Sequence, residues 1–268
     1  MSALQRGIAA GVCALTLAAC GSSSGTASRS PTTTPTTATT SGPQPAGQPP
    51  SGTVGPGSAY DPPIDPADFQ ATVDNPWFPL EPGSSYVYTG VKDGTPARDV
   101  YRVTRSTQTI DGVPCVIVDD RLYLAGHLEE KTSDYYTQDK QGNVWYFGER
   151  TAELDPTGKV TSTEGSWLAG VRGAKPGLFM EANPVVGHAY RQEYDRGNAE
   201  DQFRVASLTE PVTVPLGHFT DALLTEETTA IEPGTLDHKV YVKGIGEVAE
   251  ITVKGPPERA LLVSYRKG

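Results

Sequence analysis

The sequence is poor in cysteine, and this limits its covalent and redox chemistry. Its 268 residues contain three cysteines, Cys13, Cys20 and Cys115. Because Cys115 alone lies beyond residue 20, the rest of the chain can form no disulfide of its own. Cys115 sits in the apolar run VPCVIV, and we expect a buried strand thiol there rather than a reactive one.

Positive charge is also scarce. Lysine and arginine number 22 against 32 aspartates and glutamates. Residues 1–59 hold Arg6 and Arg29 and no acids, so residues 60–268 carry a formal charge of −12. Nucleic acid is bound through basic patches, so we expect no nucleic-acid partner. The same charge disfavours flat docking on an anionic membrane surface.

Catalytic signatures are missing from the chain. Residues 60–268 contain no G-x-S-x-G, H-E-x-x-H, P-loop or dinucleotide fingerprint. The four histidines form no i, i+4 pair and have no metal-site spacing. We therefore predict no catalytic residue, no metal and no cofactor. One enzymatic alternative stays open, because a carboxylate pair about 5–9 Å apart could act on a glycosidic bond. The candidates include Glu164, Glu181, Glu193, Glu200 and Asp201.

The N-terminal apolar stretch is too short to span a bilayer. Ile8 to Ala18 follow Arg6 and lead into small residues, as in an export signal. Leu17-Ala18-Ala19-Cys20 resembles the lipobox of bacterial lipoproteins at all four positions. The resemblance implies that residues 1–19 are a signal peptide and that Cys20 carries a diacylglycerol. The partner is then the membrane, and the protein lies on its extracytoplasmic face.

Residues 20–59 form the second predicted segment, a tether. Between Gly21 and Ala59, all but four residues are Gly, Ser, Thr, Ala or Pro. Such a composition cannot bury enough apolar surface to offset the entropy of ordering, so we predict disorder. The remaining residues, 60–268, fit one large domain.

Residues 60–268 are predicted to be mainly β. Asp93-Gly94 and Asp111-Gly112 separate strand-like runs and are typical of hairpins. Val240 and Val242 share one face, opposite Tyr241, as in a half-buried strand. We predict a curved antiparallel meander, a half-barrel or open barrel, with one short helix and long irregular loops.

Three local features complete this prediction. Asp65-Pro66-Ala67-Asp68 resembles a capped first helical turn, and we expect the helix to end near Val73. Residues 74–84, DNPWFPLEPGS, contain three prolines, so we interpret them as a plug across one end of the sheet. Tyrosine is abundant, with 12 residues, and it suits a groove or an outer strand face; we favour the outer face.

Residues 164–187 form the least regular stretch. Glycines and prolines exclude a long helix or strand, yet the stretch carries large apolar side chains. Such a loop either packs on a core or lies on a ligand. If it is a lid, the side chains that we expect to contact an apolar ligand are Trp167, Leu178, Phe179 and Met180.

Several motifs together resemble a family of secreted proteins and lipoproteins common in actinobacteria. They are DNPWFPL, GNVWYFGE and EGSWLAG followed by ANPVVG and YRQEY. The family has no established activity to carry over. A more distant likeness, to lipoprotein-carrier half-barrels, rests on the strand meander and the location.

These observations favour a membrane-anchored lipoprotein that binds a lipid or another apolar ligand on a concave sheet face. An envelope scaffold or interaction protein is the alternative. A glycan-acting enzyme with paired carboxylates is the third hypothesis, and the missing motifs speak against it.

Overall fold

The computed structural model describes residues 60–268. The predicted signal peptide (1–19), the lipidation site Cys20 and the tether (20–59) lie outside the described residues. Within residues 60–268, none of the helical structure is long or apolar enough for a bilayer crossing.

Sixteen strands form one sheet, as predicted for a mainly β chain. The strands are β1 (Phe69–Gln70), β2 (Ser85–Lys92), β3 (Thr95–Ile110), β4 (Val113–Leu124), β5 (His127–Asp139), β6 (Val144–Leu154), β7 (Val160–Ser162), β8 (Trp167–Leu168), β9 (Lys175–Met180), β10 (Ala189–Arg191), β11 (Glu193–Tyr194), β12 (Asp201–Val214), β13 (Gly217–Thr229), β14 (Leu236–Val242), β15 (Gly246–Lys254) and β16 (Glu258–Arg266).

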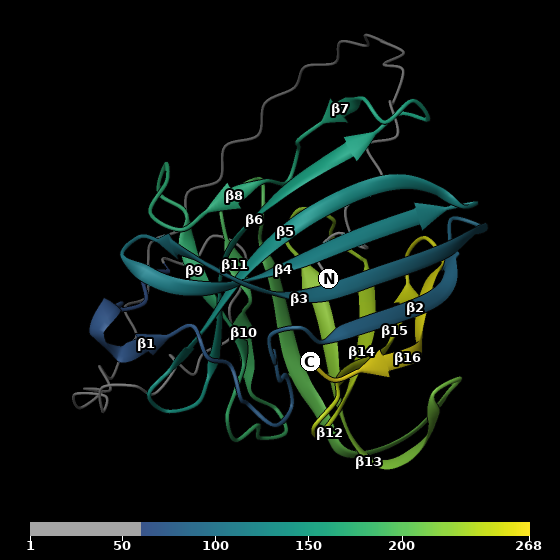
Figure 1. Cartoon of the computed structure of the whole chain (residues 1–268). Coiled ribbons are helices and arrows are strands. Elements are labelled where there is room, and N and C mark those ends of the chain that lie inside the picture. The colour runs from purple at the N-terminus through teal and green to yellow at the C-terminus, as the bar shows by residue number, and fades with distance from the viewer. Residues whose placement is uncertain (1–59) are drawn as a thin grey trace, which may run out of the picture.

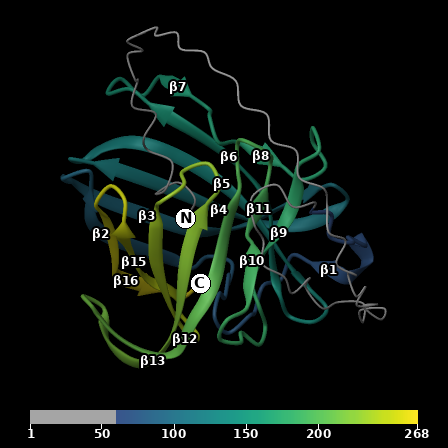
Figure 2. The same ribbon diagram turned by 180° about the vertical axis from the view of Figure 1, so that it is seen from behind.

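The sheet is a nearly closed barrel built from two meanders. Strands β2 to β6 pair in sequence order and form one wall, and β12 to β16 pair in the same way and form the facing wall (Figures 1 and 2). Antiparallel pairing of β16 with β2 joins the two meanders. The prediction of a curved antiparallel meander is confirmed, and closure goes further than a half-barrel.

Tight turns fix the register of the hairpins. Both residues of Asp93-Gly94 and of Asp111-Gly112 have positive φ, which matches the twist of the flanking strands. Ala125-Gly126 adopts the same conformation between β4 and β5. Because alanine rarely adopts positive φ, the sequence does not predict this third turn.

A short segment closes the barrel at its seam. Strand β10 pairs with β12, whereas β11, which follows after Gln192, pairs with β9. One stretch of chain thereby brings the two edges of the sheet together. A Cβ at Gly177 would lie 2.1 Å from the carbonyl carbon of Gln192, so glycine permits this close approach.

The helix prediction is only partly confirmed. Asp65 caps the turn by accepting a hydrogen bond from the Ala67 amide, but the helical element is a single 3-10 turn, η2 (Pro66–Asp68). Phe69 is already extended and begins β1, which pairs with β5. Strand pairing therefore ends the turn well before Val73.

The plug, residues 74–84, lies across one end of the barrel as predicted. Trp77, Phe78 and Leu80 are buried. Asn75 fastens the plug, because its side-chain amide donates to the carbonyls of Gly142 (2.9 Å) and Glu181 (3.1 Å). We call this the plugged end, and the end with the β2–β3 and β4–β5 turns the open end.

Two expectations about apolar residues need correction, and one is confirmed. The stretch 164–187 is not wholly irregular, since it contains β8 and β9. Most tyrosines are buried rather than exposed on an outer face; the buried ones are Tyr86, Tyr88, Tyr101, Tyr135, Tyr136, Tyr146, Tyr190 and Tyr241. Cys115 is fully buried in β4, as expected, and burial raises the pKa of its thiol to about 12.

Candidate functional site

The interior of the barrel is rich in carboxyl groups. Buried acids occur on both walls; they include Asp99, Asp120, Asp134, Glu149, Glu227, Glu247 and Glu250. Lys239 and Arg191 are buried cations. Burying an ionised carboxylate is costly unless it is paired, so this composition makes the barrel interior a candidate functional site.

Strand register places four side chains in one row near the open end. Asp99 lies opposite Leu122, Leu122 opposite Glu130, and Glu130 opposite Glu153, across β3, β4, β5 and β6. Asp99, Leu122 and Glu130 are buried, so the row faces inward. Like charges directly opposite one another destabilise a sheet, and Glu130 and Glu153 are such a pair.

A depression of about 270 Å³ opens beside this row. Its lining residues come from the ends of β2 to β6; they are Lys92, Asp93, Thr95, Leu122, Leu124, Glu129, Glu130 and Glu153. Four carboxyl groups and one ammonium group give the lining a formal charge of −3. We call this feature the open-end depression.

Two acids around the open-end depression have raised pKa values. Burial raises the pKa of Glu130 to about 7, although Lys92 acts in the opposite direction. Glu130 accepts a hydrogen bond from the Thr132 hydroxyl (3.1 Å). Burial also raises the pKa of Glu258 to about 8, and its Oε1 lies 3.6 Å from Nζ of Lys92. Glu130 and Glu258 therefore titrate near neutral pH.

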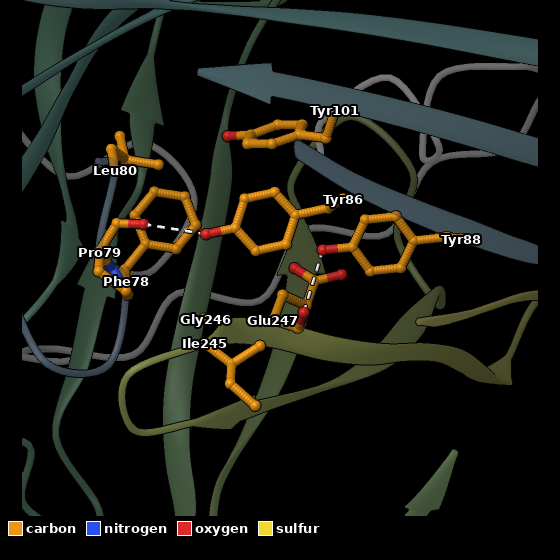
Figure 3. Close-up of a pocket in the computed structure, with 9 residues that line it drawn as sticks. All are labelled: Phe78, Pro79, Leu80, Tyr86, Tyr88, Tyr101, Ile245, Gly246 and Glu247. Atoms are coloured by element: carbon orange, nitrogen blue, oxygen red, sulfur yellow. Dashed lines mark hydrogen bonds between the residues drawn. The ribbon is translucent and has the colours of Figure 1, made fainter. Parts of the chain in front are cut away.

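A second, much smaller cavity of about 10 Å³ lies under the plug. Figure 3 shows its lining, which comes from the plug, β2, β3 and the start of β15; the residues are Phe78, Pro79, Leu80, Tyr86, Tyr88, Tyr101, Ile245, Gly246 and Glu247. We call it the plug cavity. A lipid chain does not fit in this volume.

The four residues predicted to contact an apolar ligand lie inside the wall of the barrel. Trp167 is buried in β8, and its indole nitrogen donates to Oε2 of Glu193 (3.0 Å). Leu178, Phe179 and Met180 are buried residues of β9. All four residues therefore pack in the hydrophobic core. Their contact with a ligand stays a prediction.

The other candidate groups have protein partners. Glu181 lies 3.1 Å from Nδ1 of His188, and the Tyr190 hydroxyl lies 2.7 Å from the same nitrogen. Among residues 60–268, no group of three or more His, Cys, Asp or Glu side chains is arranged to hold a metal ion.

Asp99 and Asp120, which are not among the carboxylates named from the sequence, interact with each other in the barrel interior. Burial, and next the charge of Asp120, raise the pKa of Asp99 well above its usual range. Both carboxyl groups are buried in the barrel interior, so a glycan chain cannot reach them.

Comparisons with known proteins give two structural likenesses. No family model and no curated protein matches the chain. A Bacteroides fragilis protein inferred to be exported, with a YmcC-like fold, is 16% identical, covers 71% of this chain and 99% of its own, and has a TM-score of 0.40. A Parabacteroides distasonis protein inferred to be a lipoprotein is 14% identical, covers 74% and 100%, and has a TM-score of 0.39.

Likenesses of this size do not indicate what the chain binds. The two neighbours are described as exported or as a lipoprotein, which is said of them alone. The resemblance to an actinobacterial family stays a prediction, because no family model matches.

Proposed function

We propose that this protein is a lipid-anchored extracytoplasmic binding protein whose barrel takes a small organic cation in the open-end depression. The observation that carries the proposal is the lining of that depression, with four carboxyl groups against one lysine around about 270 Å³. Ligand sites are concave and hold a few convergent polar groups, and the mouth of a barrel is a common place for them.

The chemistry of the depression favours ammonium groups over neutral or anionic ligands. The facing pair Glu130 and Glu153 repel each other when both are ionised, and a cation between them removes that cost. Leu122 and Leu124 add apolar surface for a short carbon chain. A diamine or a short polyamine combines both features.

Calorimetric titration of the full-length protein in detergent tests this function. We expect putrescine or spermidine to bind and 1,4-butanediol, the neutral analogue of putrescine, not to bind. Glu153→Gln should weaken binding about tenfold, and Glu164→Gln, an exposed matched control in the loop after β7, should not change it. Equal heats for diamine and diol would overturn the proposal.

Binding should also depend on the protonation of Glu130. Because its pKa is about 7, the carboxyl is mostly ionised at pH 8 and mostly protonated at pH 6. The affinity for a diamine should therefore fall as the pH falls from 8 to 6. A flat pH profile in wild type would show that Glu130 does not contact the ligand.

The anchor rests on Leu17 to Cys20. One acyl chain binds membranes only marginally, whereas two hold firmly, so a diacylglycerol on Cys20 suffices without a spanning helix. Cys20→Ser should release the protein from the membrane fraction or leave an unprocessed precursor. Normal processing with unchanged membrane retention would contradict the assignment.

The domain boundary is proposed at Tyr60. The Tyr60 hydroxyl donates to the carbonyl of Pro176 (3.1 Å), and its ring packs edge-on against Tyr194. A truncated chain that begins at Tyr60 should keep these contacts and melt at the same temperature as the full chain. A clearly lower midpoint would show that residues 20–59 stabilise the fold.

An apolar ligand or partner at residues 164–187 is a second candidate function. It is favoured by three exposed valines in that segment, Val171 (48%), Val185 (48%) and Val186 (56%). If Trp167 only packs, Trp167→Ala should cost about 3–5 kcal/mol and leave binding of a fluorescent fatty-acid analogue unchanged. If the segment is a lid, the loss of stability is smaller and probe binding weakens. No probe binding by wild type would exclude the lid.

A further inference from the structure

The plug cavity contains a carboxyl group whose interactions are incomplete. The side chain of Glu247 is 3% exposed, and its Oε2 has no hydrogen-bond partner among the described residues. Figure 3 places this carboxyl group among the rings of Tyr86 and Tyr88, inside the lining of the cavity. A buried acceptor in this condition carries the full cost of its lost hydration.

The neighbouring phenols do not supply the missing hydrogen bond. The Tyr88 hydroxyl donates to the backbone carbonyl of Glu247 (3.0 Å), and the Tyr86 hydroxyl donates to the carbonyl of Pro79 (3.2 Å). A phenol has one hydrogen to donate, so both are already used. The carboxyl group therefore lies beside two tyrosines without receiving a hydrogen bond from either.

The lysine near Glu247, Lys239, contacts two other carboxyl groups. Nζ of Lys239 lies 2.9 Å from Oε2 of Glu227 and 3.6 Å from Oε1 of Glu250. Burial raises the pKa of Glu247 well above its usual range; Lys239 lowers it, and Glu250 and Glu227 raise it further. Three carboxyl groups thus share one lysine.

We propose that the plug cavity binds a single ammonium group, with Oε2 of Glu247 as the anionic acceptor and the aromatic rings as its walls. The faces of tyrosine and phenylalanine rings attract cations, and the walls include Phe78, Tyr86 and Tyr88. The volume of about 10 Å³ is close to that of one water-sized probe, so ammonium fits and a quaternary ammonium does not.

Two sources could supply this group, free ammonium or the end of a primary amine. The plug residues Phe78, Pro79 and Leu80 line the cavity, so a primary amine needs additional space for its carbon chain. Methylammonium tests whether there is space for that carbon. This proposal does not depend on the open-end depression, whose lining shares no residue with the plug cavity.

The experiment compares thermal unfolding of the full-length protein in equal concentrations of four chloride salts at pH 7.5. Ammonium should raise the midpoint by roughly 3–6 °C over sodium and over tetramethylammonium, as expected for a ligand near tenfold above its Kd. A matching rise with methylammonium assigns the site to primary amines, and no such rise assigns it to ammonium itself. Identical midpoints in ammonium and sodium overturn the proposal.

Variants then locate the effect. Glu247→Gln keeps the shape and removes the charge, so it should abolish the ammonium response, whereas Glu153→Gln at the open end should keep it. A response that survives Glu247→Gln but is lost in Glu153→Gln overturns the plug-cavity assignment. Should Glu247→Gln fail to fold, Glu247→Asp, which keeps the charge but shortens the side chain, should weaken the ammonium response; an unchanged response would overturn the assignment.

Discussion

The two ends of the barrel differ in the side chains that fill them. At the plugged end, aromatic rings fill the space; the Phe78 ring lies 4.5 Å from that of Phe179 and 5.3 Å from that of Tyr136, centroid to centroid. At the open end, Lys92 and several carboxyl groups surround a depression of about 270 Å³. Aromatic packing contributes stability, whereas buried acids cost it. The plugged end therefore offsets the cost of the acids at the open end, where we propose that the ligand binds.

The protonation of the buried acids reduces the free-energy cost of the polar interior. Burial raises the pKa values of Glu130 and Glu250 to about 7 and that of Glu258 to about 8, so these acids are partly protonated near neutral pH. A protonated carboxyl group can remain in a barrel interior at much lower cost than an ionised one. Binding of a cation shifts the group back to the ionised state and is thus coupled to a proton release.

We expect the largest effect on stability when an aromatic ring is removed from the plugged end. Phe78 is 2% exposed and contacts aromatic residues of three strands, Tyr136, Phe179 and Tyr241. Phe78→Ala should lower the free energy of unfolding by about 3–5 kcal/mol, as for a large core truncation. Denaturant unfolding measures this loss. Phe78→Leu, which keeps much of the side-chain volume, should lose clearly less; equal losses would mean that the aromatic ring itself, and not its volume, carries the stabilisation.

Sequence reasoning was sound where local chemistry decides the structure. Asp93-Gly94 and Asp111-Gly112 predict hairpins because positive φ is required there, and both occur. The three prolines of residues 74–84 exclude a central strand, and this segment is the plug. Strand β9 was missed, because Pro176 and Gly177 are unfavourable in strands and are tolerated here beside the closing segment.

The candidate site could not be predicted for a physical reason. Asp99, Tyr101 and Val103 share an inward face, yet an acid at the end of such a pattern normally indicates a solvated strand end. Inward-facing acids can be identified as a site only when the cross-strand register is known, because the register places Glu130 opposite Glu153. Register depends on turns and bulges that a single sequence does not reveal.

A medium effect should come from pH. Glu130 and Glu258 have pKa values of about 7 and about 8, above those of an unfolded chain, so the folded state binds protons more tightly. Stability is then greatest at low pH and falls as the pH rises through these values. The thermal midpoint should rise by at least about 2 °C between pH 8.5 and pH 5.5. Glu130→Gln should flatten this profile; an unchanged profile would place the titrating group elsewhere.

The smallest effect is expected at the rim of the open-end depression. Glu129 is exposed and lines the depression, and it is one of the acids that give it a negative charge. Exposed substitutions away from the core usually change stability within about 0.5 kcal/mol, so Glu129→Gln should leave the denaturant midpoint nearly unchanged. Because it removes one negative charge at the mouth, it should still weaken diamine binding, and more so at low salt, since screening reduces the interaction of exposed charges. Titration at about 20 and 200 mM salt measures this difference. A stability loss as large as that of Phe78→Ala would show that the open end supports the fold, and the contrast between the two ends would fail.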